Sequence, residues 1–165
     1  MTLKDRIIRL IETGGPIPVS TYMQLALHDS AQGYYATRPG LGTDFITAPE
    51  VSQVFGELIG LWVVNEWRAM GAPDSFHLVE IGPGRGTLMA DALRLAYVAG
   101  GREFADAAKL TLVEPSPELR KVQAERLSDY TPSFADTLGN VPAGPMILVA
   151  NEYLDCLPAR QFRKA

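Results

Sequence analysis

The chain has 165 residues, of which 47% are hydrophobic, and this length supports one hydrophobic core of ordinary size. Its formal net charge is -4, and its 15 Lys and Arg residues are scattered along the chain. Because no basic stripe is available to neutralise phosphates, nucleic acid is not an expected partner.

Single residues and short segments further restrict the class of protein and its compartment. Cys156 is the only cysteine, which excludes an internal disulfide, and no Cys/His grouping has the spacing of a zinc site, so no metal is expected. The N-terminal stretch MTLKDRIIRLIETGG lacks the unbroken apolar core of a signal peptide, and no run of 18 apolar residues occurs. We therefore expect a soluble protein of a reducing compartment, without membrane insertion.

Two short helices are predicted at the start of the chain. Thr2 and Asp5 resemble a capping box, apolar residues follow at helical spacing, and Gly14 begins the Gly-Gly-Pro stop. Ser20 is expected to cap the second helix. The residues 28–45 then have the composition of turns and loop.

A longer helix is predicted over residues 47–70. Thr47 and Glu50 form a second capping-box pattern with proline in the first turn, and Gly71 follows the last helical residue. Apolar residues occupy most of the circumference of this helix, so we expect it to be largely buried, with Trp62 and Trp67 in the core.

Polar residues form one stripe on that predicted helix. Glu50, Gln53 and Glu57 are spaced three and then four apart, and Gly60 continues the stripe. One interpretation is a solvated face. The other is a lid over a ligand or a wall of its pocket, with Glu50 closest to the ligand.

From residue 76 onward, short apolar runs alternate with helical segments. The runs are FHLVEIG, KLTLVE, a weak one near 133–136 and PMILVANE, separated by predicted helices over 87–99 and 117–128. This alternation is typical of βαβ units and predicts an α/β fold with a parallel, Rossmann-like sheet. Ligands of such sheets bind at the carboxyl ends of the strands.

The stretch 78-LVEIGPGRGTLMADAL-93 places Gly82, Gly84 and Gly86 between a strand and a helix. A P-loop is disfavoured because no lysine follows Gly86. A dinucleotide-binding turn is disfavoured because it requires the spacing G-x-G-x-x-G. The observed G-x-G-x-G spacing remains compatible with an ordinary strand-to-helix turn.

Two acidic residues favour a different cofactor. Glu80 precedes the glycines, and Glu114 ends the next predicted strand, where its carboxylate could accept hydrogen bonds from both hydroxyls of a ribose. Together with the glycines they are the arrangement of an S-adenosyl-L-methionine site. Glu80 would then face the amino group of the methionine portion, directly or through water.

Four segments resemble one protein family. They are 43-TDFITAPEVSQVFGELIGLW-62, 81-IGPGRGTLMAD-91, 112-LVEPSPELR-120 and 151-NEYLDCLPARQF-162, and together they resemble the MidA family of class I methyltransferases. The family includes a mitochondrial complex I assembly methyltransferase and its bacterial relatives. Thr43 departs from the family pattern, which commonly has glycine there.

The resemblance implies a function. It implies S-adenosylmethionine-dependent methylation of arginine on a protein substrate, with a respiratory complex I subunit as the candidate partner. It further implies the cytoplasm as the location in a bacterium and the mitochondrial matrix in a eukaryote. Two alternatives stay open: an assembly factor that keeps the fold but acts by holding a partner, and a methyltransferase with a non-protein acceptor.

The predicted strand 146-MILVA-150 delivers three polar residues to the ligand edge of the sheet. We expect Glu152 and Asp155 to contact the substrate, with Glu50 as a third catalytic residue, and Asn151 to lie near the methyl donor. Asp136 is expected at the adenine amino group. The alternative for these residues is capping of strand ends and helices.

The predicted organisation is a helical N-terminal extension and lid over residues 1–72, followed by the N-terminal part of the methyltransferase domain over 73–165. Because class I methyltransferases have seven strands and four are visible here, we expect the chain to be a fragment of a larger protein.

Overall fold

The computed structural model describes residues 1–37 and 46–164. They form two compact units: Met1–Gly40 with Glu152–Ala165, and Leu41–Asn151. The predicted boundary between 1–72 and 73–165 stays a prediction. Residues 43–45 of the first family-like segment, and Thr43 with them, lie outside the described residues. No helix in the described ranges is both long and apolar enough to cross a membrane.

The first unit begins with the helices α1 (Leu3–Gly14), α2 (Val19–His28) and α3 (Tyr34–Thr37). The predicted capping box is confirmed, since Thr2 accepts from the backbone N–H of Asp5 while the Asp5 carboxylate accepts from that of Thr2. The predicted cap at Ser20 is wrong. Pro18 is the N-cap of α2, because its extended backbone leads directly into Val19.

The C-terminal segment of the chain packs within the same unit. It contains the 3-10 helix η3 (Leu154–Cys156), and the carbonyl oxygen of Cys156 lies 2.9 Å from Nε2 of His28. The imidazole ring of His28 also stacks on Tyr35, with ring centroids 5.5 Å apart. His28 therefore has structural partners on two sides.

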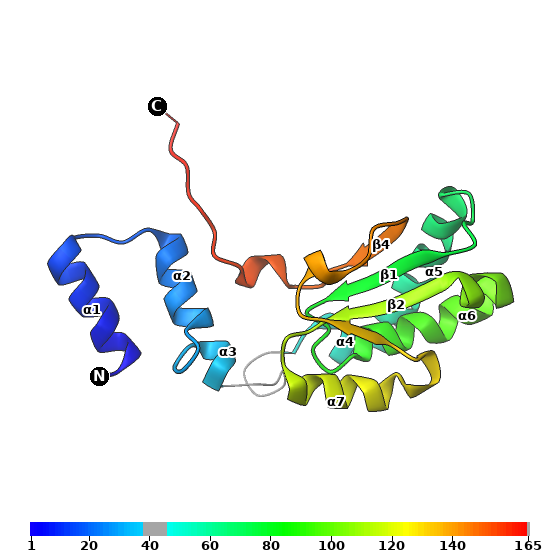
Figure 1. The fold of residues 1–165 in the computed structure, drawn as a ribbon, viewed down its shortest axis with the longest axis horizontal. Helices are drawn as coiled ribbons and strands as arrows, with labels where there is room; N and C mark the ends of the chain where they lie inside the picture. Colours follow the sequence, from blue (N-terminus) through cyan, green and yellow to red (C-terminus); the bar gives the residue numbers. More distant parts are fainter. Residues whose placement is uncertain (38–45, 165) are drawn as a thin grey trace. The chain divides into compact units, whose positions relative to one another are not determined.

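The second unit contains a four-stranded parallel sheet in the order β3-β2-β1-β4 (Figure 1). Its strands are β1 (Phe76–Ile81), β2 (Ala108–Val113), β3 (Ser133–Ala135) and β4 (Met146–Val149). All neighbouring pairs are parallel. The predicted α/β fold with four strands is confirmed, and the crossovers bring all four carboxyl ends to one edge.

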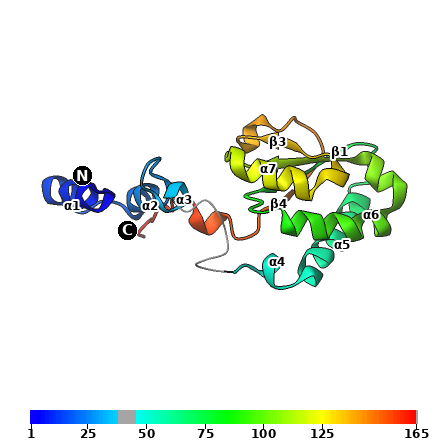
Figure 2. The ribbon, with the colours of Figure 1, turned by 90° about the horizontal axis from the view of Figure 1, so that it is seen from below.

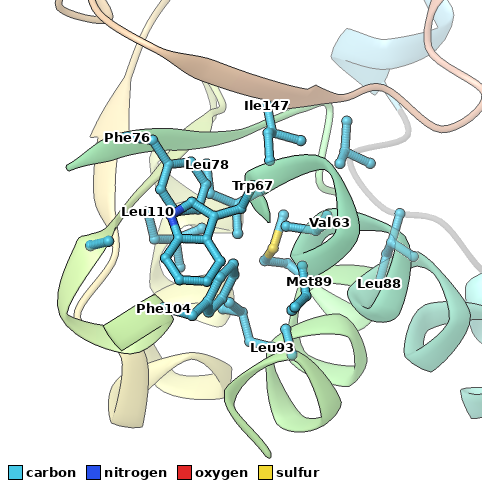
Figure 3. Close-up of a cluster of buried hydrophobic side chains, with 14 of the residues drawn as sticks. Val63, Trp67, Phe76, Leu78, Leu88, Met89, Leu93, Phe104, Leu110 and Ile147 are labelled. Carbon is cyan, nitrogen blue, oxygen red and sulfur yellow. The ribbon is translucent and has the colours of Figure 1, made fainter. Parts of the chain in front are cut away.

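Three helices cover one face of this sheet (Figure 2): α5 (Gln53–Ala69), α6 (Thr87–Ala107) and α7 (Pro117–Arg126). The core lies between α5, α6 and the sheet, where Trp67 meets Phe104 edge to face with centroids 5.5 Å apart (Figure 3). α6 runs further than the predicted 87–99, across a non-helical Gly101.

The predicted continuous helix over 47–70 is wrong. Ser52 has extended backbone angles and separates a short helix, α4 (Ala48–Val51), from α5, and Thr47 makes no side-chain capping bond. The expected burial is also wrong, because one face of the segment is exposed. Trp67 is buried as predicted, whereas Trp62 is 44% exposed and does not belong to the core.

Glycines allow α5 and α6 to pack closely. A Cβ atom at Gly56 would lie 2.6 Å from Cβ of Asp91, and one at Gly60 would overlap the backbone of Ala92. One side of α5 therefore packs on α6, while its apolar residues Val54, Leu58, Leu61 and Trp62 are exposed.

Candidate cofactor site

The turn between β1 and α6 carries three glycines with positive φ. The values are 65° at Gly82, 54° at Gly84 and 75° at Gly86. Residues with a Cβ atom rarely adopt this region, so the alternate spacing of glycines follows from the backbone path. The amide of Gly86 donates to the carbonyl oxygen of Pro83 at 2.8 Å, which closes the turn directly before α6 begins.

Glu80 lies near the carboxyl end of β1 with an apolar residue on each side. Its neighbours across the sheet are Leu112 and Val149, and both are buried. Glu80 itself is 2% exposed, and its Oε2 atom has no hydrogen-bond partner among the described residues. Burial raises the pKa of this carboxyl group to about 8. A cationic group placed beside Oε2 would favour its ionised form.

Glu114 follows β2 and is the second buried carboxylate of this edge. Its Oε1 accepts from the backbone N–H of Ser116 at 2.8 Å, and its Oε2 lies 3.4 Å from the amide nitrogen of Gln123. Burial raises the pKa of Glu114, and these two hydrogen bonds oppose that rise.

Asp136 follows β3 and pairs with Arg120 of α7. The guanidinium Nη2 lies 2.7 Å from Oδ1 of Asp136, while Nε donates to the carbonyl oxygen of Glu114 at 2.6 Å. Arg120 also lies over the ring of Phe134, 5.7 Å from its centroid. The ends of β2 and β3 are thereby joined through one guanidinium, with the carboxylate of Asp136 on the exposed side.

Glu50 contacts the first residue of α6. Its Oε1 accepts from the hydroxyl of Thr87 at 2.7 Å, and the same hydroxyl oxygen accepts from Arg126 of α7. α4 is thus tied to the helix start that directly follows the glycine turn. The contact joins Glu50 to the residue that follows Gly86, while the predicted place of Glu50 beside the ligand stays a prediction.

The other polar residues of the predicted stripe lie on α5 and contact each other and α6. Oε1 of Glu57 accepts from the amide of Gln53 at 3.0 Å and from Arg94 of α6 at 2.8 Å. These contacts hold α5 and α6 together at the rim of their interface. A lid or pocket-wall role for this stripe stays a prediction.

The residues after β4 divide between the two units. Asn151 belongs to the second unit with the glycine turn, whereas Glu152 and Asp155 belong to the first. Glu152 has a φ of 49°, which is uncommon for a residue other than glycine. The expected substrate contacts of Glu152 and Asp155, and the expected place of Asn151 near the methyl donor, remain predictions.

The sequence analysis did not single out Gln123, which is fully buried on α7. Its side chain donates to the carbonyl oxygen of Gly84 at 2.7 Å and contacts Glu114. A glutamine within the polar helix PELRKVQAER carries no motif. The one signal in the sequence is that Gln123 lies four residues before Leu127, an apolar residue that is also buried, so that both would share one helix face.

No cluster of three or more His, Cys, Asp or Glu side chains able to hold a metal ion occurs within the described ranges. The polar groups at the carboxyl edge of the sheet include the carboxylates of Glu80, Glu114 and Asp136, the amide of Gln123 and the guanidinium of Arg120. Such a set suits an organic ligand that carries an amino group and hydroxyls.

The sequence is similar to several characterised proteins. It is 41% identical to the protein arginine methyltransferase NDUFAF7 homolog, mitochondrial, of Drosophila melanogaster, over 98% of this chain and 42% of that protein. It is 39% identical to the protein arginine methyltransferase NDUFAF7, mitochondrial, of Homo sapiens, over 93% of this chain and 40% of that protein. The chain therefore spans about two fifths of the length of these relatives.

Solved structures share the fold. A crystal structure from Burkholderia thailandensis bound to S-adenosyl-homocysteine matches with a TM-score of 0.72 and 28% identity, over 94% of this chain and 41% of that one. A family model described as "Putative S-adenosyl-L-methionine-dependent methyltransferase" matches residues 58–165. The chain therefore belongs to this family of S-adenosyl-L-methionine-dependent methyltransferases, as its resemblance to the MidA group predicted.

Proposed function

We propose that the full-length protein transfers a methyl group from S-adenosylmethionine to an arginine side chain of a protein. The observation that carries the proposal is the buried Oε2 of Glu80, which has no hydrogen-bond partner in the part of the chain that the structure describes, followed in the sequence by three glycines with positive φ. A charged carboxylate at that depth needs a cation, and the cofactor carries an ammonium group. The protein arginine methyltransferase names of the relatives support the choice of acceptor.

The cofactor supplies an activated methyl group on its sulfonium. The chain's own residues bind and orient it: Glu80 receives the ammonium group, and Gly82 and Gly84 leave the backbone bare for close approach. Glu114 accepts from the ribose hydroxyls. Asp136 receives the adenine amino group, with Arg120 fixing the position of its carboxylate.

The acceptor side requires more carboxylates. A guanidinium has a pKa above about 12 and delocalised lone pairs, so it is a poor nucleophile. Carboxylates that accept from two of its nitrogens localise positive charge away from the third and help remove the proton. We assign this role to Glu152 and Asp155, with Asn151 near the donor, because these polar residues follow the strand β4 in the sequence, and ligands of parallel sheets bind beyond the carboxyl ends of the strands.

The acceptor protein that we propose is a subunit of respiratory complex I. This choice of acceptor rests on the resemblance of the sequence to a family that includes a complex I assembly methyltransferase. The mitochondrial names of the relatives support a mitochondrial location if the source is a eukaryote.

Calorimetric titration of the full-length protein tests the cofactor. S-adenosylmethionine and S-adenosylhomocysteine should each bind with one site, and NAD should give no signal. Glu80→Gln should lower the affinity for both ligands, because the amide cannot pair with the ammonium group. Binding of NAD without binding of S-adenosylmethionine would refute the proposal.

A further inference from the structure

Gln123 connects the ends of two strands through one side-chain amide. Its Nε2 lies 2.7 Å from the carbonyl oxygen of Gly84, in the turn after β1, and 3.4 Å from Oε2 of Glu114, at the end of β2. Its Cγ also lies 3.5 Å from the position that a Cβ of Gly86 would take. The side chain is therefore packed under the glycine turn.

The orientation of this amide follows from its neighbours. The oxygens of Gly84 and Glu114 both accept hydrogen bonds, so the NH2 group must face them and Oε1 must face away. Oε1 is buried and has no partner within the described ranges. Gln123 thus leaves one acceptor unsatisfied while it donates to two oxygens of the cofactor edge.

We propose that Gln123 is a positioning residue that sets the spacing between the glycine turn and Glu114. The inference deepens the proposed function and rests on it: the turn holds the methionine portion of S-adenosylmethionine, and Glu114 holds the ribose. Because one amide contacts both elements, it keeps the turn that holds the methionine portion in register with the carboxylate that holds the ribose before the cofactor binds.

The bonding capacity of Glu114 fits this role. A carboxylate has about four acceptor positions, two on each oxygen. The N–H of Ser116 takes one on Oε1, and Gln123 takes one on Oε2. One position remains on each oxygen, which matches the two hydroxyl groups of a ribose, and the two donors fix the carboxylate plane.

The first test is amide hydrogen exchange in the cofactor-free full-length protein. In Gln123→Leu, which is similar in size but has no donor, the amides of Gly82 and Gly86 should exchange at least about tenfold faster than in the wild type. These amides donate to Val113 and Pro83, so their protection reports on the turn itself. Protection of the core amide of Leu78 serves as the internal control for global stability.

The second test is affinity for S-adenosylmethionine. Loss of a hydrogen bond to a charged group should weaken binding by Gln123→Leu about tenfold or more. If this variant fails to fold, Gln123→Glu provides the same test, because the new carboxyl group can donate to Glu114 only when it is protonated. The ratio of the variant's dissociation constant for S-adenosylmethionine to that of the wild type should therefore rise as pH increases from 6 to 9.

Ala124→Glu is the matched control, since it adds the same charge at the next, exposed residue of α7. Its dissociation constant relative to the wild type should not change with pH. Unchanged turn protection in Gln123→Leu, or a pH-independent ratio in Gln123→Glu, would overturn the positioning role. A wild-type protein that does not bind S-adenosylmethionine would instead refute the proposed function, while the exchange experiment still decides the role of Gln123.

Discussion

The carboxyl group of Glu80 is buried between apolar neighbours, and this makes the free energy of unfolding depend on pH. Its pKa is raised to about 8 in the folded chain, whereas the ordinary value is 4.5. The folded state therefore binds more protons than the unfolded state between these values, so the contribution of Glu80 to stability is present below pH 4.5 and is lost as pH rises to about 8.

Glu80→Gln should remove this dependence in the cofactor-free full-length protein. Relative to the wild type, the variant should gain up to about 1.4 kcal/mol in free energy of unfolding per pH unit between pH 5 and 8. Urea unfolding at three pH values measures the difference. A difference that stays constant with pH would mean that Glu80 is solvated or paired in the folded protein.

Glu152 combines a predicted catalytic carboxylate with a left-handed backbone, at a φ of 49°. Glu152→Gly should relieve the backbone and raise the free energy of unfolding by about 0.5–1 kcal/mol, while abolishing methyl transfer. Thr131→Gly is the control, because Thr131 has a φ of 46° and no predicted role. It should stabilise the protein equally and leave activity unchanged; retained activity in Glu152→Gly would exclude the catalytic assignment.

At the residue scale, the sequence predicted features that depend on local spacing, namely the glycine turn and a carboxylate after the next strand, while their roles in cofactor binding stay predictions. Gly82, Gly84 and Gly86 are required by a backbone path that their neighbours define, and Glu114 ends a recognisable strand. Gln123 could not be found in this way, because its burial depends on how α7 packs under the turn. The hydrogen bond between Glu50 and Thr87 likewise could not be predicted from local spacing, because these residues lie 37 positions apart in the sequence.

At the scale of elements, the predictions for strands were more accurate than those for the helix at 47–70. Its capping pattern and its apolar residues both favoured one buried helix. The structure breaks the segment at Ser52 and exposes Val51 and Leu58, by 73% and 59%. Periodicity gives the apolar sides of a helix but not which of them packs on a neighbour, and here the glycine side packs on α6.

Gly60→Ala tests that packing. The added methyl group would overlap the backbone of Ala92, which cannot move without shifting α6. The free energy of unfolding should fall by about 1–3 kcal/mol, despite the better helix propensity of alanine. Gly14→Ala in α1 is the control, because no atom of residues 1–37 or 46–164 outside its own helix and its chain neighbours lies within 4 Å of the new Cβ, and it should not destabilise the protein. Equal effects at both positions would show that α5 does not pack on α6 through Gly60.

The attachment of α4 to α6 can be separated from a catalytic role of Glu50. Glu50→Gln keeps an oxygen that accepts from Thr87, so it should retain most activity, whereas Glu50→Ala and Thr87→Val should each lose about tenfold. Methyl transfer under saturating cofactor measures the effect. If the Gln variant is as inactive as the Ala variant, the charge of Glu50 itself takes part in the reaction, as the sequence analysis predicted.

At the scale of the whole molecule, the chain forms two compact units, and one of them is built from two segments that are far apart in the sequence. Residues 152–165 group with the N-terminal helices, through contacts such as that between His28 and Cys156. No composition shift marks this grouping, so the sequence could not predict it. The fold class was predictable because alternating strands and helices with short connections allow few topologies.

The central claim is methyl transfer to arginine by the full-length protein. The most direct test incubates it with methyl-labelled S-adenosylmethionine and protein from cells that lack its gene, and locates the label by mass spectrometry. We predict label on arginine of a protein acceptor, lost in Glu152→Gln and Asp155→Asn although both variants still bind the cofactor. Absence of protein label from the wild type with bound cofactor, or label on another residue type only, would contradict the account.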